Sequence, residues 1–194
     1  MKLAAITGSI GCGKTTLASQ AKSLGYTVFD ADGWVRRLYF RKNFINTIIK
    51  EFPSTLENGL FNKRKLRHLV FDDNRQLKKL EALIHPFLKN ELKNRIRKNA
   101  AKDDIFFLDV ALLFEMGWDK YCDLIIVANV DDDIQKSRVM KRDNVSAEHF
   151  EKINNVQMSQ KEKIKRADVV IDTDVPVNLL RVQIIEIVKG LACK

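Results

Sequence analysis

The sequence predicts an α/β fold, a parallel sheet of about five strands flanked by helices. Short apolar runs rich in β-forming residues recur along the chain, and helical patterns separate them. The runs are continuous rather than alternating, as is typical of strands buried on both faces of a parallel sheet. They lie at residues 3–7, 27–29, 105–110, 124–130 and 169–172.

A helical insertion is predicted between the second and third runs, because the gap is too long for one crossover helix. Helix-like segments lie around 43–51, 63–71 and 76–99. We therefore expect a single domain over residues 1–194, with a core formed by 1–32 and 101–194. The insertion, about 33–100, should lie over the carboxyl ends of the strands.

Composition narrows the function classes. Hydrophobic residues make up 45% of the 194 residues and charged residues 30%, as in ordinary globular proteins. The net charge of +9 favours anionic partners, but the basic residues are dispersed and no aromatic-studded basic run suggests nucleic-acid binding. Three widely spaced cysteines give no zinc or disulfide pattern. With no signal peptide or membrane-spanning stretch, we expect a cytoplasmic protein with phosphorylated small molecules as partners.

Residues 8–15, GSIGCGKT, match the P-loop pattern G-x-x-x-x-G-K-[ST] between a strand and a helical pattern. Converging backbone N–H groups of such a loop bind nucleotide phosphates. Lys14 is placed to reach the β- and γ-phosphates, and Thr15 to ligate Mg²⁺. The alternative is a glycine-rich turn that only caps a helix.

Cys12 occupies a variable position of this loop, where a small side chain is sufficient. An alternative hypothesis is that the helix N-terminus and Lys14 lower the pKa of its thiol and make it redox-sensitive.

The stretch FDADGWVRR, residues 29–37, ends the second apolar run with two acids. Asp32 is the candidate general base for an acceptor hydroxyl, and Asp30 is a candidate support for this loop or for a metal shell through water. Two alternatives are that Asp32 only caps a helix beginning near Trp34, or that DADG is a GTPase switch. The guanine-reading N-K-x-D motif is absent, which disfavours the switch.

Two further elements carry candidate site residues. Asp109 ends an apolar run and is a candidate Mg²⁺-organising acid, whereas Glu115 fits a structural role. Arg138 and Arg142 are four residues apart and share a helix face, either as cations of a lid or as a solvated surface.

Six segments, in this order and spacing, resemble dephospho-coenzyme A kinases over nearly the whole chain. They are GSIGCGKTT, FDADGWVRR, LEALIHPFL, FLDVALLFE, SRVMKRDNVS and ADVVIDTD. The resemblance implies a P-loop kinase core, a helical CoA-binding insertion and a lid at about 132–160. It also implies transfer of the γ-phosphate of ATP to the ribose 3′-hydroxyl of dephospho-CoA, with Mg²⁺. No nucleic-acid or membrane partner is implied.

The resemblance also assigns roles by position. Asp32 would be the base, and Arg138 with Arg142 would belong to the lid. The residues that would hold the ATP phosphates are Gly11, Cys12, Gly13, Lys14, Thr15 and Thr16. The residues assigned to the acceptor side are Asp30, Lys63, Arg64 and His85, where a buried structural histidine before the helix-kinking Pro86 is the alternative for His85.

Some positions depart from the family pattern. Ser9 stands where a second glycine is usual, Ala111 replaces a frequent proline, and Thr173 to Val175 replace the usual asparagine and glycine near the adenine. The alternatives are another P-loop kinase, such as one for nucleoside monophosphates, or a nucleotide-binding protein acting on nucleic acid.

Overall fold

The computed structural model describes residues 1–71, 73–101 and 104–192 and divides into two compact units. The first unit comprises Met1–Asp30 and Lys98–Lys194, and the second comprises Ala31–Arg97. The expected boundaries were 32/33 and 100/101, whereas the chain divides at 30/31 and 97/98. The functions expected of the two parts stay predictions.

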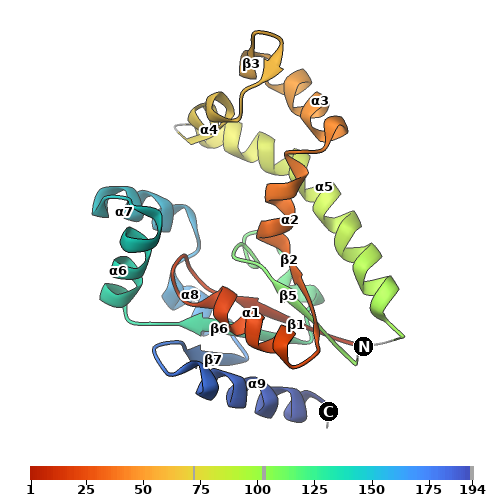
Figure 1. Cartoon of the computed structure of the whole chain (residues 1–194), viewed down its shortest axis with the longest axis vertical. Helices are drawn as coiled ribbons and strands as arrows, with labels where there is room; N and C mark the ends of the chain where they lie inside the picture. Colours follow the sequence, from red (N-terminus) through yellow and green to blue (C-terminus); the bar gives the residue numbers. More distant parts are fainter. Residues whose placement is uncertain (72, 102–103, 193–194) are drawn as a thin grey trace. The chain divides into compact units, whose positions relative to one another are not determined.

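Five parallel strands form the sheet of the first unit in the order β2-β5-β1-β6-β7, so the predicted α/β class is confirmed (Figure 1). Strand β1 lies at the centre of the sheet, and for this reason every one of its residues after Lys2 is buried. The strands are β1 (Lys2–Thr7), β2 (Thr27–Asp30), β5 (Ile105–Asp109), β6 (Leu124–Asn129) and β7 (Val169–Asp172).

The strand register gathers polar residues at one edge of the sheet. Asp30 at the end of β2 is opposite Asp109 at the end of β5, and Asn129 at the end of β6 is opposite Asp172. Thr7, the last residue of β1, is opposite Val127. Because the strands are parallel, their carboxyl ends meet at the edge from which the glycine loop leaves β1.

Three helices of the first unit begin at a capping side chain. The side chains of Asp131, Ser146 and Ser159 accept hydrogen bonds from the first-turn N–H groups of α6, α7 and α8. Such caps satisfy donors that have no partner within the helix. The elements are α1 (Lys14–Ser23), η2 (Asp119–Tyr121), α6 (Asp132–Asp143), α7 (Ala147–Val156), α8 (Gln160–Lys165) and α9 (Val177–Ala192).

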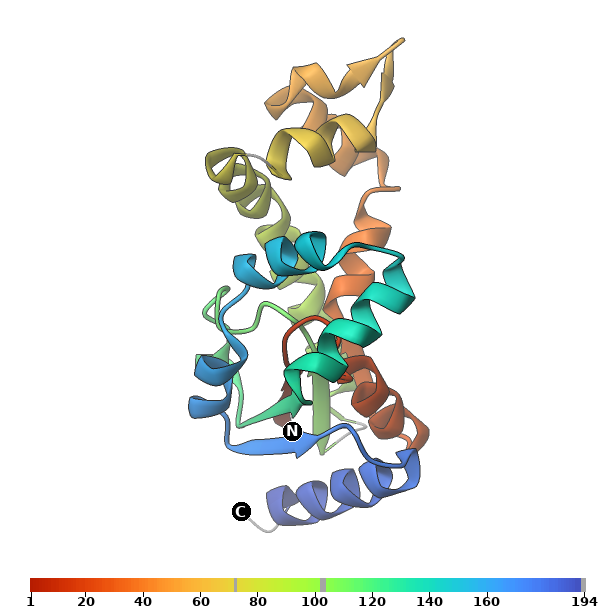
Figure 2. The ribbon, with the colours of Figure 1, turned by 90° about the vertical axis from the view of Figure 1, so that its left-hand side faces the viewer.

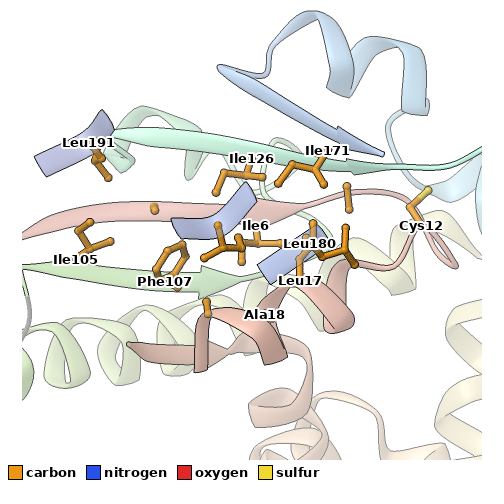
Figure 3. Close-up of a cluster of buried hydrophobic side chains, with 14 of the residues drawn as sticks. Ile6, Cys12, Leu17, Ala18, Ile105, Phe107, Ile126, Ile171, Leu180 and Leu191 are labelled. Atoms are coloured by element: carbon orange, nitrogen blue, oxygen red, sulfur yellow. The ribbon is translucent and has the colours of Figure 1, made fainter. Parts of the chain in front are cut away.

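The main core of the first unit lies between the sheet and the helices α1 and α9 (Figure 3). Ile6, Phe107 and Ile126 from the three central strands meet Leu17 of α1 and Leu180 of α9. Each side chain of this kind, when fully buried, contributes about 1.5–3 kcal/mol relative to exposure. This core fixes the first turn of α1 against β1, which positions the glycine loop between them.

The second unit is helical, as predicted. The expected helices at 43–51, 63–71 and 76–99 are found as α3, α4 and α5. The elements are α2 (Ala31–Leu38), α3 (Lys42–Glu51), η1 (Pro53–Thr55), β3 (Leu56–Glu57), β4 (Leu60–Phe61), α4 (Lys63–Phe71) and α5 (Asn74–Asn99). The antiparallel β3–β4 pair was not predicted, although Asn58 and Gly59, both with positive φ, form the Asn-Gly turn typical of tight hairpins.

The second unit has its own small core. The ring of Phe44 meets the rings of Tyr39 and Phe87 edge-on, with centroids 5.4 Å apart in both pairs. Phe44 and Ile48 on α3 are fully buried, as is Leu38 on α2. In the part of the chain that the structure describes, no helix is long and apolar enough to cross a membrane.

Candidate active site

Glycines give the loop between β1 and α1 its shape. Gly11 and Gly13 have φ of 82° and 79°, a region that favours glycine. A Cβ at Gly13 would lie 2.6 Å from Thr173 Oγ1, and a Cβ at Gly11 would lie 2.5 Å from Val139 Cγ2. The loop therefore reaches its position only because these residues have no side chain.

The loop runs directly into α1, whose N-cap is Gly13 and whose first residues are Lys14 and Thr15. The first N–H groups of a helix have no partner within it and carry the positive end of the helix dipole. Loop and helix together form a site suited to the phosphates of a nucleotide.

Lys14 and Asp109 are brought together beside this loop. Lys14 Nζ lies 2.7 Å from Asp109 Oδ1, and both side chains are largely buried, at 13% and 5% exposure. Asp109 ends β5 next to Asp30 of β2. A carboxylate and a lysine ammonium group thus meet at the carboxyl edge of the sheet, where the sequence placed the nucleotide site.

The two candidate lid arginines both pair with carboxylates. Arg138 of α6 donates to Asp174 Oδ1 at 2.9 Å and to Thr173 Oγ1 at 3.3 Å. Arg142 pairs with its neighbour Asp143 at 2.7 Å. Thr173 also donates to the carbonyl of Cys12 at 2.9 Å, so Arg138 reaches the glycine loop through one residue.

Cys12 is fully buried in the main core of the first unit. Burial raises the pKa of its thiol from 9.0 to about 11, because a thiolate is poorly solvated there. The hypothesis that the helix N-terminus and Lys14 lower the pKa of Cys12 is therefore wrong, and a redox role of Cys12 loses that support. Burial likewise raises the pKa of Cys122 to about 12, and Cys193 lies outside the described residues.

Asp32 lies in the second unit, in the first turn of α2. This helix begins at Ala31 rather than near Trp34, so the alternative in which Asp32 serves as the cap is wrong. A carboxylate in the first turn interacts favourably with the helix dipole and stabilises the helix. This contribution says nothing about proton transfer. The role of general base stays a prediction.

A basic pocket of about 410 Å³ lies within the second unit and includes the candidate residues Lys63 and Arg64. Its other lining residues are Tyr39, Leu66, Arg67, Val70 and Leu80. Lys63 Nζ lies 4.7 Å from the ring centroid of Tyr39, a cation–π contact. Burial raises the pKa of Tyr39 from 10.0 to about 12, because the phenolate is poorly solvated there.

His85 lies on α5 and is half-buried, less than the alternative hypothesis of a buried structural histidine expected. Pro86 follows it inside the helix and has no N–H to donate to the carbonyl of Ala82. His85 does not line the basic pocket, and its role as an acceptor ligand stays a prediction.

Lys163 is a fully buried residue of α8 that was not predicted from the sequence. Lys163 Nζ donates to the carbonyl of Ala111 at 2.9 Å and lies 3.5 Å from Glu115 Oε1. Glu115 Oε1 also accepts from the N–H of Met158 at 2.7 Å, which confirms its structural role. Lys163 therefore joins α8 to the segment that follows Asp109. The local sequence QKEKIK resembles a solvated helix and carries no signal of this burial.

Arg67 was missed as well. Arg67 lines the basic pocket. It follows Arg64 by three residues, a spacing that places both side chains on one face of a helix and could have indicated its role.

Comparisons with known proteins agree with the fold and with the resemblance in the motifs. The family profile for dephospho-CoA kinase matches residues 2–178. A dephospho-CoA kinase from Brucella melitensis biotype 1 is 40% identical over 191 residues, covering 97% of this chain and 94% of the relative. A crystal structure from Thermus thermophilus is similar with a TM-score of 0.87 and 31% identity, covering 98% of this chain and 97% of the other. The dephospho-CoA kinase from Campylobacter jejuni shares the fold, with a TM-score of 0.71, 24% identity and 98% coverage of both chains. The chain therefore belongs to the dephospho-CoA kinase family.

Proposed function

We propose that this chain transfers the γ-phosphate of ATP to the ribose 3′-hydroxyl of dephospho-CoA, giving CoA and ADP. The observation that carries the proposal is the glycine loop with its buried Lys14–Asp109 pair, in a chain that matches a kinase family over almost its full length. As a member of that family, the chain is an ATP-dependent phosphotransferase.

The phosphate end of the reaction is assigned to the loop and to α1. Within residues 11–16, the N–H groups of Cys12 and Thr16 donate to the carbonyls of Ser9 and Gly13, and the other N–H groups would donate to the phosphate oxygens. Lys14 would transfer its contact from Asp109 to the β- and γ-phosphates. The positive charge of Lys14 stays compensated in this exchange, because the phosphates replace Asp109 as its anionic partner. Its ammonium group would then stabilise the charge that develops on the transferred phosphoryl group.

A magnesium ion fits the donors at this edge. Asp109 supplies a carboxylate, Thr15 supplies an exposed hydroxyl in the first turn of α1, and hard oxygen donors with phosphate are what Mg²⁺ prefers. Among the described residues no group of three or more histidine, cysteine, aspartate or glutamate side chains could hold a metal ion. When bound, Mg²⁺ neutralises charge on the β- and γ-phosphates.

Asp32 is proposed to accept the proton of the 3′-hydroxyl, with Asp30 as support at the end of β2. Arg138 and Arg142 would leave the carboxylates of Asp174 and Asp143 to contact the transferring phosphoryl group. The lid, residues 132–160, would supply these cations and exclude water.

The acceptor is assigned to the second unit. Lys63 and Arg64, with Arg67, give its pocket three cationic groups, and Leu66 and Leu80 give it an apolar wall. A diphosphate joined to a nucleoside and a pantetheine arm offers both kinds of partner. His85 is proposed as a further acceptor ligand.

We also propose a cytoplasmic location and no nucleic-acid partner.

The deciding experiment measures ADP release from ATP and Mg²⁺ with different acceptors. Dephospho-CoA should stimulate release, and mass spectrometry should find CoA as the second product. AMP and CMP should give no stimulation. Release that depends on AMP or CMP would instead make the chain a nucleoside monophosphate kinase.

A further inference from the structure

Glutamine side chains bind both backbone groups of Ile10, the third residue of the glycine loop. The N–H of Ile10 donates to Gln157 Oε1 at 3.1 Å, and its carbonyl accepts from Gln135 Nε2 at 2.7 Å. Ile10 is 147 residues from Gln157 and 125 residues from Gln135. A loop residue has no ladder partner, so these two side chains satisfy groups that would otherwise need water.

A third glutamine binds the preceding residue. Gln160 Oε1 accepts from the N–H of Ser9 at 3.0 Å, while Gln160 Nε2 donates to the carbonyl of Ala128 at 2.8 Å and to Asn129 Oδ1 at 3.1 Å. Gln160 therefore connects the first turn of the loop to the carboxyl end of β6.

The three glutamines come from the two ends of the segment proposed as the lid. Gln135 lies in the first turns of α6, Gln157 is the C-cap of α7, and Gln160 begins α8. In Figures 1 and 2 the teal-to-blue segment from α6 to α8 lies beside the red loop that joins β1 to α1.

Packing and a further contact hold the same place. Gln135 is 3% exposed and also donates to Asn154 Oδ1 of α7 at 3.4 Å. The fully buried Val139, one turn further along α6, occupies the space in front of Gly11. The start of α6 and the end of α7 are thus fixed to the same turn of the loop.

We infer, on the basis of the phosphate binding proposed above, that Gln135, Gln157 and Gln160 form a clasp of positioning residues. The clasp holds Ser9 and Ile10 so that the following N–H groups of the loop converge on the phosphates, and it ties both ends of the lid to the loop. Because the N–H groups of Ser9 and Ile10 are bound by glutamines, the phosphates are held by the later residues of the loop. The glutamines act through the backbone and touch no reacting atom.

The substitution Gln157→Met keeps the length of the side chain and removes the acceptor for Ile10 N–H. We expect the dissociation constant for ATP to rise about tenfold and kcat to fall about 10- to 100-fold, because small misplacements of binding groups cost this much. The KM for dephospho-CoA should be unchanged. Gln20→Met, on α1 and away from the clasp, is the matched control and should leave all three values unchanged.

The single variant Gln135→Met and the double variant Gln135→Met/Gln157→Met test whether the two glutamine side chains act as a unit. Both glutamines hold Ile10, so the double variant should lose little more ATP affinity than the worse single variant. Independent structural roles would multiply the two losses, and that result would overturn the clasp.

ATP affinity is measured by calorimetric titration without acceptor, so the outcome does not depend on phosphorylation of dephospho-CoA. A Gln157→Met protein with a lower melting temperature but wild-type ATP affinity and kcat would make the clasp merely structural and overturn the inference. If that variant does not fold, Gln157→Asn, whose amide is one methylene too short, gives the same comparison. Wild-type protein that binds ATP but gives no CoA would refute the proposed function and leave the titration of the clasp valid.

Discussion

The two units hold their cations in opposite ways. In the first unit Lys14 and Lys163 are 13% and 0% exposed, and each bonds to a fixed acceptor. In the described part of the second unit no charged side chain is buried, and three of its cations, Lys63, Arg64 and Arg67, line a pocket. The first unit thus has the charge arrangement of a preorganised phosphate site, whereas the second has that of an adaptable surface.

This difference sets how each unit should respond to substitution. Removing one partner of a buried ion pair leaves the other uncompensated and costs stability, whereas an exposed cation contributes about 0–1 kcal/mol. Substitution of a buried cation of the first unit should therefore reduce stability. Substitution of a pocket cation of the second unit should reduce acceptor binding with little effect on stability.

The largest expected effect is that of Asp32→Asn, which removes the proposed base from the first turn of α2. We expect kcat to fall about 10² to 10⁴-fold, as for loss of a general base, with ATP affinity unchanged and a loss of stability of at most about 1 kcal/mol from the helix dipole. Steady-state kinetics and calorimetric titration measure these quantities. Asp30→Asn, in the first unit, should cost less because support is its proposed role. Near-wild-type kcat in Asp32→Asn would refute the base assignment.

The strands and the glycine loop could be predicted because their signals are local. Residues 28–29 and 124–128 are continuous apolar runs, and the spacing of Gly8, Gly13 and Lys14 directly indicates the loop. The start of α2 was misplaced by three residues because DADG also fits a cap, and the β3–β4 hairpin was missed because its strands have two residues each.

The contacts that support the loop could not be predicted. Gln157 and Gln160 are ordinary polar residues in a polar segment, and their partners are about 150 residues away along the chain. Lys163 is likewise an ordinary polar residue of a polar segment, and its partner Ala111 is 52 residues away. Such pairs follow from the topology of the sheet, which places α8 beside the loop, and no spacing in the sequence expresses it.

Lys163→Met should give the next largest effect, a loss of stability of about 2–3 kcal/mol. Breaking a buried ion pair costs about 3–5 kcal/mol of stability. We expect a smaller loss here because Glu115, the partner left behind, is 24% exposed. Urea unfolding measures the loss. Lys161→Met, an exposed position of the same helix, should change stability by less than about 0.5 kcal/mol. Equal effects of the two variants would contradict the structural role of Lys163.

The pH dependence of stability tests the burial of Cys12. Its pKa of about 11 in the folded chain exceeds the ordinary value of 9.0, so the unfolded chain loses the proton first as pH rises. Stability from this group is complete below pH 9 and is lost between pH 9 and about 11, on the order of 2 kcal/mol. The stability difference between wild type and Cys12→Ala should therefore shrink over this range in urea unfolding. A constant difference from pH 8 to 11 would show that the thiol is not held protonated.

The smallest expected effect separates the cations of α4 in the second unit. Lys63→Ala and Arg64→Ala should each raise the KM for dephospho-CoA about tenfold, since each removes one charged contact to a diphosphate. Lys65→Ala is the matched control, because Lys65 does not line the pocket and pairs with Glu57 at 3.0 Å. All three variants should keep wild-type ATP affinity and melting temperature. The increases in KM should diminish at high salt, where exposed charges are screened. Equal increases in KM for all three would indicate attraction by general positive charge rather than by the pocket. A loss of stability in Lys63→Ala comparable to that of Lys163→Met would contradict the contrast between the two units.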